Sequence, residues 1–393
     1  MLGLLILKNL KLLYNWKQKH IVQLFLMRLN QSNQLLLKYL LNKIGYALLT
    51  LFGVVTVIFF LFNVLPGDPA RMMLDQNENS EQLAIVKKKY GFDKPISTQY
   101  FYYLNDLSPI SFHSTNSEDY TFLSEGKYNA VSLISIGNNE VVLKSPYLRE
   151  SFQKSGKKVS DVIGNTLPNT FLLALFAIVI AIAIGILLGI ISALYKDTWI
   201  DRIIALLSTL GMSIPSFFSA ILFAWFFGFL LHEYTGLNMT GSLYEVDDFG
   251  EGSYIQWRNI LLPAIVLGIR PLGVVIQLMR NSLLETLGQD YIRTARAKGL
   301  SEFQIIRKHA VKNSLNPVVT AISGWFASML AGAVFVEYIF GWNGLGKEIV
   351  EALNNLDLPV IMGSVIVIAT TFVVINILVD LVYAYLDPKI RIS

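Results

Sequence analysis

The chain has 393 residues, of which 53% are hydrophobic and 15% are charged, with a formal net charge of +4 and no cysteine. Soluble domains carry about 25% charged residues, and here the apolar residues gather in long blocks, which indicates a membrane protein rather than a large soluble core. The lack of cysteine excludes disulfides, thiolate metal sites and cysteine nucleophiles. The mild positive charge fits the cytoplasmic loops of a protein embedded in a lipid bilayer, and no nucleic-acid partner is expected.

Residues 1–43 mix leucines with lysines, as in LGLLILKNLKLLYNW. This composition predicts a cytoplasmic N-terminal extension that forms a basic amphipathic helix on the inner leaflet. An over-long reading frame, with the true start at Met27 or nearby, is the alternative for residues 1–37. The N-terminal mass of the expressed protein would separate the two hypotheses.

Six apolar stretches are long enough to cross a bilayer, for which a helix needs about 20 residues. The first is longer than the core of a signal peptide and has no small-residue cleavage site after it, so we expect it to remain a helix. Pro215 and Pro271 lie inside the third and fourth stretches, where neighbouring helices can satisfy the freed backbone groups. We therefore predict an all-α integral membrane protein with six transmembrane helices, at residues 44–65, 171–195, 203–231, 260–279, 318–340 and 360–386.

Residues 66–158 are long enough to form a small insert between the first two spans. Residues 80–90 predict a short helix with Ser80 as its cap and Gly91 as its stop. The run AVSLISIGNNEVVLK predicts a β-hairpin that turns near Gly137. The aromatic stretch STQYFYYL either docks a partner or builds the core of this small domain.

The distribution of charge sets the orientation. Residues 232–259 carry five acids and only one base, Arg258. Residues 280–317 are rich in bases, namely Arg293, Arg296, Lys298, Arg307, Lys308 and Lys312. The positive-inside rule then places this loop, both termini and the tail 387–393 in the cytoplasm, and the count of spans places the insert outside. Six spans require both termini to share a side, so the span count and the charges agree.

The basic loop contains local signals for two short helices joined at one glycine. Residues 290–298 have helical composition, with an acid at the start and a base at the end, as the helix dipole favours. Gly299 follows where a left-handed residue commonly ends a helix. Ser301 and Gln304 have the spacing of a capping box, and Leu300 and Ile305 that of a hydrophobic staple. Such agreement predicts a rigid surface that either fits a groove on another protein or contacts anionic lipid.

Arg270 lies midway along the fourth predicted span, where a charged side chain is costly and usually faces a polar path or a partner. A contact that caps backbone carbonyls is the alternative. Asp380 lies much nearer the cytoplasmic end of its span, so direct pairing with Arg270 is not expected. We predict that Arg270 lines the translocation pathway.

Two other patterns are negative. GWNGLGK, residues 341–347, has the spacing of a phosphate-binding loop, but Glu348 stands where that motif needs Ser or Thr, and an apolar helix rather than a strand precedes it. The four histidines have no metal-ligand spacing. We therefore predict no catalytic residue, no metal and no cofactor bound by this chain.

Asp290 to Thr320, DYIRTARAKGLSEFQIIRKHAVKNSLNPVVT, resembles the EAA loop of ABC importer permeases, in the branch that handles dipeptides, oligopeptides, nickel and glutathione. Five further stretches resemble the same branch, and two regions depart from it, the leader 1–37 and residues 108–156. The further stretches are NVLPGDP, YGFDKPISTQY, IGNTLPNTFLLAL with RNSLLETLGQDY, and VFVEYIFGWNGLGKEIVEAL.

The resemblance implies an ABC type I importer permease fold, with the permease core at residues 159–386. It implies a homologous second permease, two ABC ATPase subunits that hold ATP and magnesium, and an extracytoplasmic substrate-binding protein. It also implies that residues 290–300 couple to the ATPases, through Asp290, Arg293, Thr294, Ala295, Arg296, Ala297, Lys298, Gly299 and Leu300. The arginines and the lysine of this helix are expected at its surface. The small side chains of Ala295 and Ala297 are expected to keep that surface narrow.

These features predict a permease subunit of an ATP-driven importer for di- or oligopeptides in the bacterial inner membrane. A nickel or glutathione importer shares the same loop. An ion-coupled carrier or channel would transport without ATPase subunits, but it would usually carry more intramembrane acids or an inverted repeat. A membrane enzyme has no supporting set of residues.

Overall fold

The computed structural model describes residues 41–63, 70, 80–117, 119–124, 127–246 and 252–386. Residues 1–40, with most of the predicted amphipathic extension, and the tail 387–393 lie outside the described part. The chain divides into two compact units, one of residues 1–54 and 377–393 and one of residues 55–376. In the first unit, Lys43 at the start of the first helix forms an ion pair with Asp380 near the end of the last.

Four helices are long and apolar enough to cross a membrane: Leu41–Asn63, α4 (Val159–Leu194), α8 (Arg258–Leu287) and α15 (Leu358–Leu386). Two bent helix pairs bring the number of candidate spans to as many as six among the described residues. Each predicted span falls on one of these segments. α4 starts earlier than expected and α8 runs on past Arg280, which we had placed in the loop.

The third predicted span is a bent pair of helices rather than one straight helix. α5 (Trp199–Ser213) meets α6 (Ser216–Phe223) and the π-helix η2 (Ala224–Leu230) at an angle of 110°. Ile214 is extended, with ψ at 132°, because the ring of Pro215 disfavours the helical conformation in the preceding residue. Proline thus makes a corner here, whereas α8 continues through Pro271.

The fifth predicted span is also bent, by 54°, between α12 (Asn316–Gly332) and α13 (Val334–Phe340). It is followed by the short helix α14 (Leu345–Asn354). Between η2 and α8 the chain forms α7 (His232–Thr235) and a two-stranded ladder of β4 (Tyr244–Val246) and β5 (Ser253–Ile255). The largest core joins α4, α6, α8, α12 and α13 around Trp342 and Phe340.

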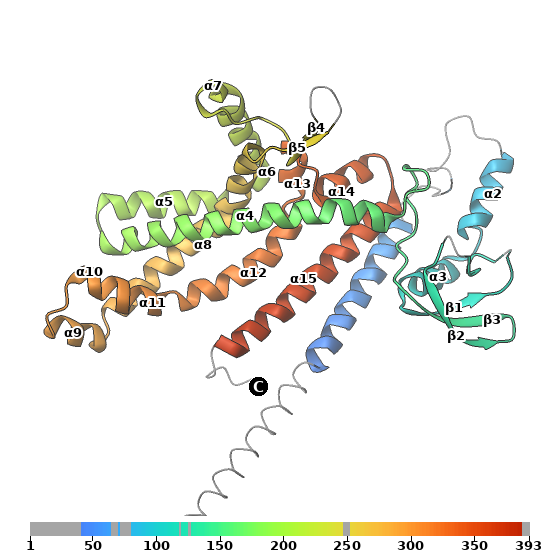
Figure 1. The fold of residues 1–393 in the computed structure, drawn as a ribbon, viewed down its shortest axis with the longest axis horizontal. Helices are drawn as coiled ribbons and strands as arrows, with labels where there is room; N and C mark the ends of the chain where they lie inside the picture. Colours follow the sequence, from blue (N-terminus) through green and yellow to red (C-terminus); the bar gives the residue numbers. More distant parts are fainter. Residues whose placement is uncertain are drawn as a thin grey trace, which may run out of the picture. The chain divides into compact units, whose positions relative to one another are not determined.

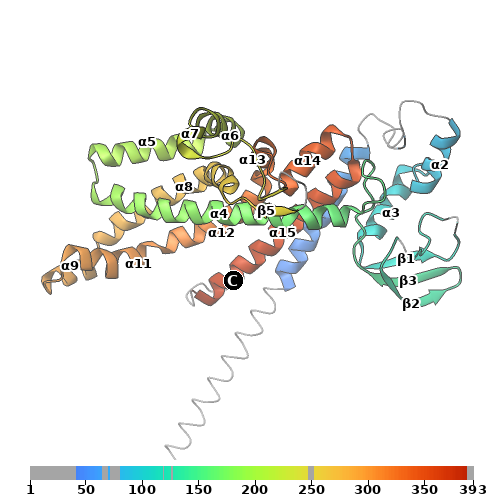
Figure 2. The ribbon, with the colours of Figure 1, turned by 45° about the horizontal axis from the view of Figure 1, so that its top comes forward.

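α4 and α8 lie side by side along their length (Figures 1 and 2). Glycines allow this close approach. A Cβ atom at Gly189 would lie 2.7 Å from the Cβ of Met279, and one at Gly268 would lie 2.8 Å from the carbonyl oxygen of Ala177. Small residues at helix contacts are typical of membrane bundles, where dispersion contacts between close backbones drive association.

The insert contains α2 (Ser80–Tyr90), α3 (Ile96–Leu107) and an antiparallel sheet in the order β1-β3-β2. The predicted helix is confirmed, and Gly91 ends it at φ +70°; the side chain of Ser80 lies outside the described part. The predicted hairpin is confirmed as β2 (Ala130–Ile136) and β3 (Asn139–Lys144), which turn at Gly137. β1 (Ile110–Ser114), which was not predicted, pairs with the other edge of β3.

The aromatic stretch of α3 contributes mainly to the interior of the insert. Tyr103 is buried, with its ring centroid 5.6 Å from that of Phe59. Tyr102 stacks on Tyr120 at 5.1 Å, while Phe101 is exposed. These contacts favour a core role over docking for most of the stretch.

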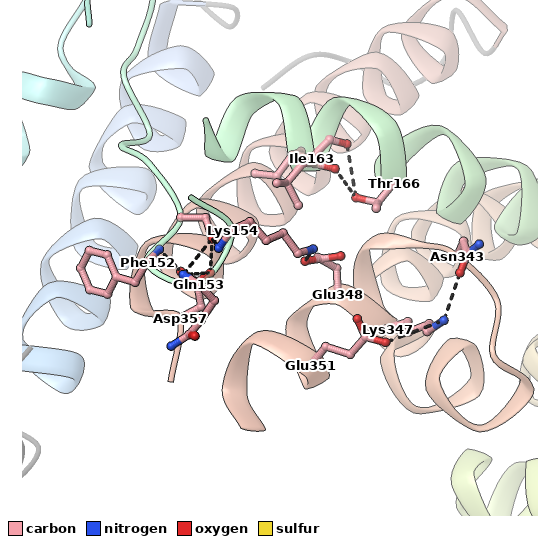
Figure 3. A network of polar contacts seen from close by, with 12 residues as sticks. Phe152, Gln153, Lys154, Ile163, Thr166, Asn343, Lys347, Glu348, Glu351 and Asp357 are labelled. Atoms are coloured by element: carbon pink, nitrogen blue, oxygen red, sulfur yellow. Dashed lines mark hydrogen bonds and ion pairs between the residues drawn. The ribbon is translucent and has the colours of Figure 1, made fainter. Parts of the chain in front are cut away.

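A polar network ties the last segment of the insert to the turn between α14 and α15 (Figure 3). The buried carboxylate of Asp357 accepts hydrogen bonds from the hydroxyl of Ser151 and, at 3.0 Å, from the backbone N–H of Phe152. Lys154 forms an ion pair with Glu348 of α14. The insert is thereby attached directly to the helical part of the same unit.

Candidate functional site

The basic loop forms a helix, a single left-handed glycine and a second helix. α9 (Asp290–Ala297) ends in a Schellman motif, in which the N–H of Gly299 bonds to the carbonyl of Arg296 at 2.9 Å and the N–H of Leu300 to that of Ala295 at 3.4 Å. Gly299 has φ +80°, a conformation that glycine adopts without steric cost. The predicted corner is confirmed.

The second helix starts with the predicted capping box. In α10 (Glu302–Ile305), the N–H of Gln304 donates to the hydroxyl of Ser301, and the amide oxygen of Gln304 accepts from the N–H of Ser301. A π-helical turn η3 (Ile306–Ala310) and α11 (Val311–Ser314) then lead to α12. Local hydrogen bonds therefore hold the direction of α10 relative to α9.

The inner side of this surface is anchored in an apolar cluster. Ile292 and Ala295 of α9 are buried together with Ile305, Met279 and Leu283. The prediction that Ala295 keeps the outer surface slim is therefore wrong, because its methyl group points inward; Ala297 is exposed as expected. A displacement of α9 must move the end of α8 with it, since their side chains interdigitate in one cluster.

The outer side of α9 is basic and exposed. Arg296 makes two hydrogen bonds to the carboxylate of Glu302, at 2.8 and 3.3 Å, while Arg293 lies 3.5 Å from Asp290. The hydrogen-bonded pair raises the pKa of Arg296 and lowers the pKa of Glu302. Thr294, Ala297, Lys298 and Leu300 are also exposed. Of the nine predicted coupling residues, all but Ala295 have exposed side chains or backbone on this surface.

Phe303 is an exposed aromatic residue that the sequence reasoning missed. It lies on α10, two residues after the capping Ser301, and 69% of its surface is accessible. Exposed aromatic side chains beside arginine are typical of the energetic centres of protein interfaces. A hydrophobic residue within the capping box, in a loop otherwise rich in charged residues, was the signal available in the sequence.

A partly buried ion pair connects α8 to the hairpin of α4 and α5, and the sequence did not reveal it. Arg280 donates two hydrogen bonds to Asp201, from Nε and Nη2, both at 2.7 Å. The same carboxylate accepts from the hydroxyl of Ser192 at the end of α4 and from the N–H of Asp197 in the turn. The carboxylate of Asp201 thus connects the end of α4, the start of α5 and the last part of α8, near the cluster that anchors α9.

Arg270 is exposed on α8, and within the described part of the chain its side chain has no hydrogen bond or ion pair. No contact with capping carbonyls is found there. The side chain therefore points away from the helices of its own unit, as a residue on a polar path or at a contact with another subunit would. Its role in the pathway stays a prediction.

The stretch GWNGLGK is arranged differently from a phosphate-binding loop. α13 precedes it, and the backbone N–H groups of Gly346 and Lys347 donate to the carboxylate of Glu337, at 2.6 and 3.3 Å. Glu337 is fully buried, and a Cβ atom at Gly344 would lie 2.4 Å from its Oε2. The carboxylate occupies the position at the start of α14 where a phosphate would have to bind.

Groups of three or more histidine, aspartate or glutamate side chains that could hold a metal are absent from the residues that the structure describes. The geometry assembles binding surfaces. It offers a rigid basic and aromatic surface at α9–α10, an ion pair behind it, and the two ends of a helical bundle.

Comparison with known proteins identifies relatives over nearly the whole chain. It is 32% identical to the dipeptide transport system permease protein DppB of Lactococcus lactis subsp. cremoris, over 91% of this chain and 100% of that protein. It is 30% identical to DppB of Alkalihalophilus pseudofirmus and 29% identical to the glutathione transport system permease protein GsiC of Salmonella choleraesuis, each over 91% of this chain. These two matches cover 100% and 99% of the relative.

Among solved structures, the chain is similar to the inward-facing MetNI methionine ABC transporter, with a TM-score of 0.47, 14% identity, and coverage of 58% of this chain and 97% of that one. Two family models also match. The model of the N-terminal part of binding-protein-dependent transport system membrane components matches residues 36–117. The model of the inner membrane component matches residues 185–392, more than half of the chain. The chain is therefore a multi-pass membrane protein that belongs to the family of inner membrane components of binding-protein-dependent transport systems.

Proposed function

We propose that this chain is one permease subunit of an ATP-driven importer for di- or oligopeptides. Membership in the family supports the transport role, and the relatives named as dipeptide permeases support the cargo. The observation that carries the mechanism is the α9–Gly299–α10 surface. Apolar side chains anchor its inner side, and its outer side is basic and aromatic. Such a surface fits a groove on separate ATPase subunits.

In this mechanism, ATP binding draws two ATPase subunits together and moves α9 with them. The shared cluster of Ile292, Met279 and Leu283 carries the movement into α8. The Arg280–Asp201 pair carries it from α8 to the ends of α4 and α5. ATP can shift the permease only as far as the ATPases prefer one of its conformations over the other.

The complete importer would contain a second, homologous permease, two ATPases and an extracytoplasmic substrate-binding protein, with both termini of this chain and α9 in the cytoplasm. The ATPases supply the energy, because the chain is proposed to have no ATPase site of its own. Arg270, exposed on α8, would line the path between the two permeases. Glutathione is the alternative cargo that a relative at 29% identity supports.

Reconstitution tests this function. The chain, a homologous partner permease, two ATPases and a binding protein are placed in liposomes, and uptake of labelled dialanine is measured. We expect uptake that requires ATP and the ATPases. Uptake by this chain alone, driven by an ion gradient, would contradict the proposal and support a secondary carrier.

Phe303→Ala is expected to weaken the association of the ATPase subunits by at least about tenfold, because truncation of an aromatic centre of an interface commonly costs 2 kcal/mol or more. The measurement is binding of purified ATPase to the chain in nanodiscs. Tyr234→Ala removes another exposed aromatic ring, on α7, and serves as the matched control. If both variants bind the ATPase equally well, Phe303 does not contribute to the contact with the ATPase.

A further inference from the structure

The insert contains a pocket that the transport mechanism does not use. Its volume is about 750 Å³, and it lies between α2, the loop that follows β1 and the segment that follows β3. Cationic and aromatic side chains line much of it, among them Lys88, Tyr90, Tyr120, Lys127, Tyr147 and Arg149. This volume falls within the range of about 300–1,000 Å³ that is typical of small-molecule sites.

Lys127 is held in this wall by aromatic rings. Its ammonium nitrogen lies 3.8 Å from the ring centroid of Tyr120 and 4.8 Å from that of Tyr128. It donates to the backbone carbonyl of Tyr120 at 2.7 Å. An ammonium group has three N–H donors, so this bond leaves donors that can reach an anion in the pocket.

The wall behind Lys127 is built around one buried carboxylate, that of Asp106. Its two oxygens accept hydrogen bonds from Arg149 at 3.0 Å, from Tyr120 at 2.8 Å and from Tyr128 at 3.1 Å. Arg149 also has φ +69°, an uncommon conformation for a residue with a side chain, which the surrounding contacts must hold. The site is therefore ordered before any ligand enters, which reduces the entropy lost on binding.

The charges in the pocket have both signs. Lys88, Lys127 and Arg149 contribute positive charge to the lining, and Asp119 and Glu150 contribute negative charge. Phe122, Ile85 and the tyrosine rings add apolar surface. A ligand that satisfies this lining carries a free carboxylate, a free ammonium group and an apolar body.

We propose that this pocket binds a small zwitterion with an apolar side chain, such as a dipeptide with free ends, and that Lys127 binds its carboxylate. The site lies on the insert, and α9 takes no part in it. Binding therefore does not rest on the proposed transport function, and the two can fail separately.

The affinity should depend on pH through Lys127. The pKa of Lys127 is lowered to about 8, chiefly by burial and also by the charges of Arg149 and Lys144, against the opposing effect of Asp106 and Glu150. A bound carboxylate stabilises the ammonium form and raises this pKa. Through Lys127, binding therefore weakens as the pH rises above about 8, because the free site then loses its proton.

The test is isothermal titration calorimetry on the full-length chain in nanodiscs, with glycylphenylalanine as the probe. Glycylphenylalanine amide, which lacks the carboxylate, is the matched ligand control. We expect the amide and the Lys127→Gln variant each to bind at least about tenfold more weakly than the acid binds the unmodified chain, because charge-assisted hydrogen bonds are lost. Lys127→Arg should retain binding, and so should Lys94→Gln, which changes an exposed lysine outside the pocket.

Three results would overturn the proposal. They are the absence of binding heat at millimolar probe, equal binding of the acid and the amide, and unchanged affinity in Lys127→Gln. The near-ultraviolet circular dichroism of the variant, compared with that of the unmodified chain, shows whether the aromatic side chains are still packed. If Lys127→Gln loses this signal, the comparison of acid and amide on the unmodified chain decides the question alone.

Discussion

Gly299→Pro is expected to abolish ATP-dependent uptake while the chain still inserts into the membrane. Proline requires φ near −65°, whereas this residue has φ +80°, and it has no N–H to donate to the carbonyl of Arg296. The corner between α9 and α10 must then open, at a cost of about 3 kcal/mol or more. Uptake and ATPase association are measured together, and both should be lost.

Three further variants test whether the left-handed conformation of Gly299 is what uptake requires. Gly299→Ala should be strained by about 1–2 kcal/mol, and Gly299→Asn less, since asparagine visits this conformation more readily. Gly288→Ala changes a nearby glycine at φ −80°, where a side chain is tolerated, and should leave uptake unchanged. Full uptake by Gly299→Pro would show that the rigid corner is not needed for coupling.

Arg280→Ala is expected to uncouple the importer, so that the complex assembles and hydrolyses ATP but uptake falls at least about tenfold. The substitution leaves the buried carboxylate of Asp201 without its cation, and breaking a buried pair in this way costs about 3–5 kcal/mol. The end of α8 can then move without the α4–α5 hairpin. Uptake, ATPase rate and thermal stability are measured on the same reconstituted complex.

The double variant Asp201→Asn/Arg280→Met separates coupling from stability. Removing both charges should restore much of the thermal stability, because no buried charge remains unpaired. Uptake should stay low, because the bidentate contact is still missing. Arg202→Ala, an exposed arginine on α5, is the control and should behave as the unmodified chain. Restored uptake in the double variant would mean that the pair is only structural.

The features of the candidate site that depend on neighbouring residues in the sequence were predicted correctly. The helix ends, the glycine corner and the capping box all depend on hydrogen bonds between residues at most six positions apart, so a short segment specifies them. The hairpin at Gly137 and the apolar lengths of the spans are likewise specified within one segment of the chain. The conformation of Gly299 is the clearest case, since the sequence around it leaves few alternatives.

The orientation of side chains relative to other elements could not be predicted in this way. Ala295 was expected outside and lies inside, because the apolar cluster that covers it comes from α8 and α10. Pro215 makes a corner while α8 continues through Pro271, although both prolines stood in apolar stretches that were predicted to be spans. Packing against neighbours decides such cases, and the linear pattern does not contain the neighbours.

The sequence by itself determined that this protein crosses a membrane, roughly where its spans lie, and the helix–glycine–helix shape of its basic loop. The tertiary structure alone brought Asp201 to Arg280, 79 positions away, and Asp106 to Arg149, 43 positions away. Hydrophobic length and helix capping act within one segment, whereas a buried ion pair or a pocket forms only when separate segments pack together and exclude water from between them.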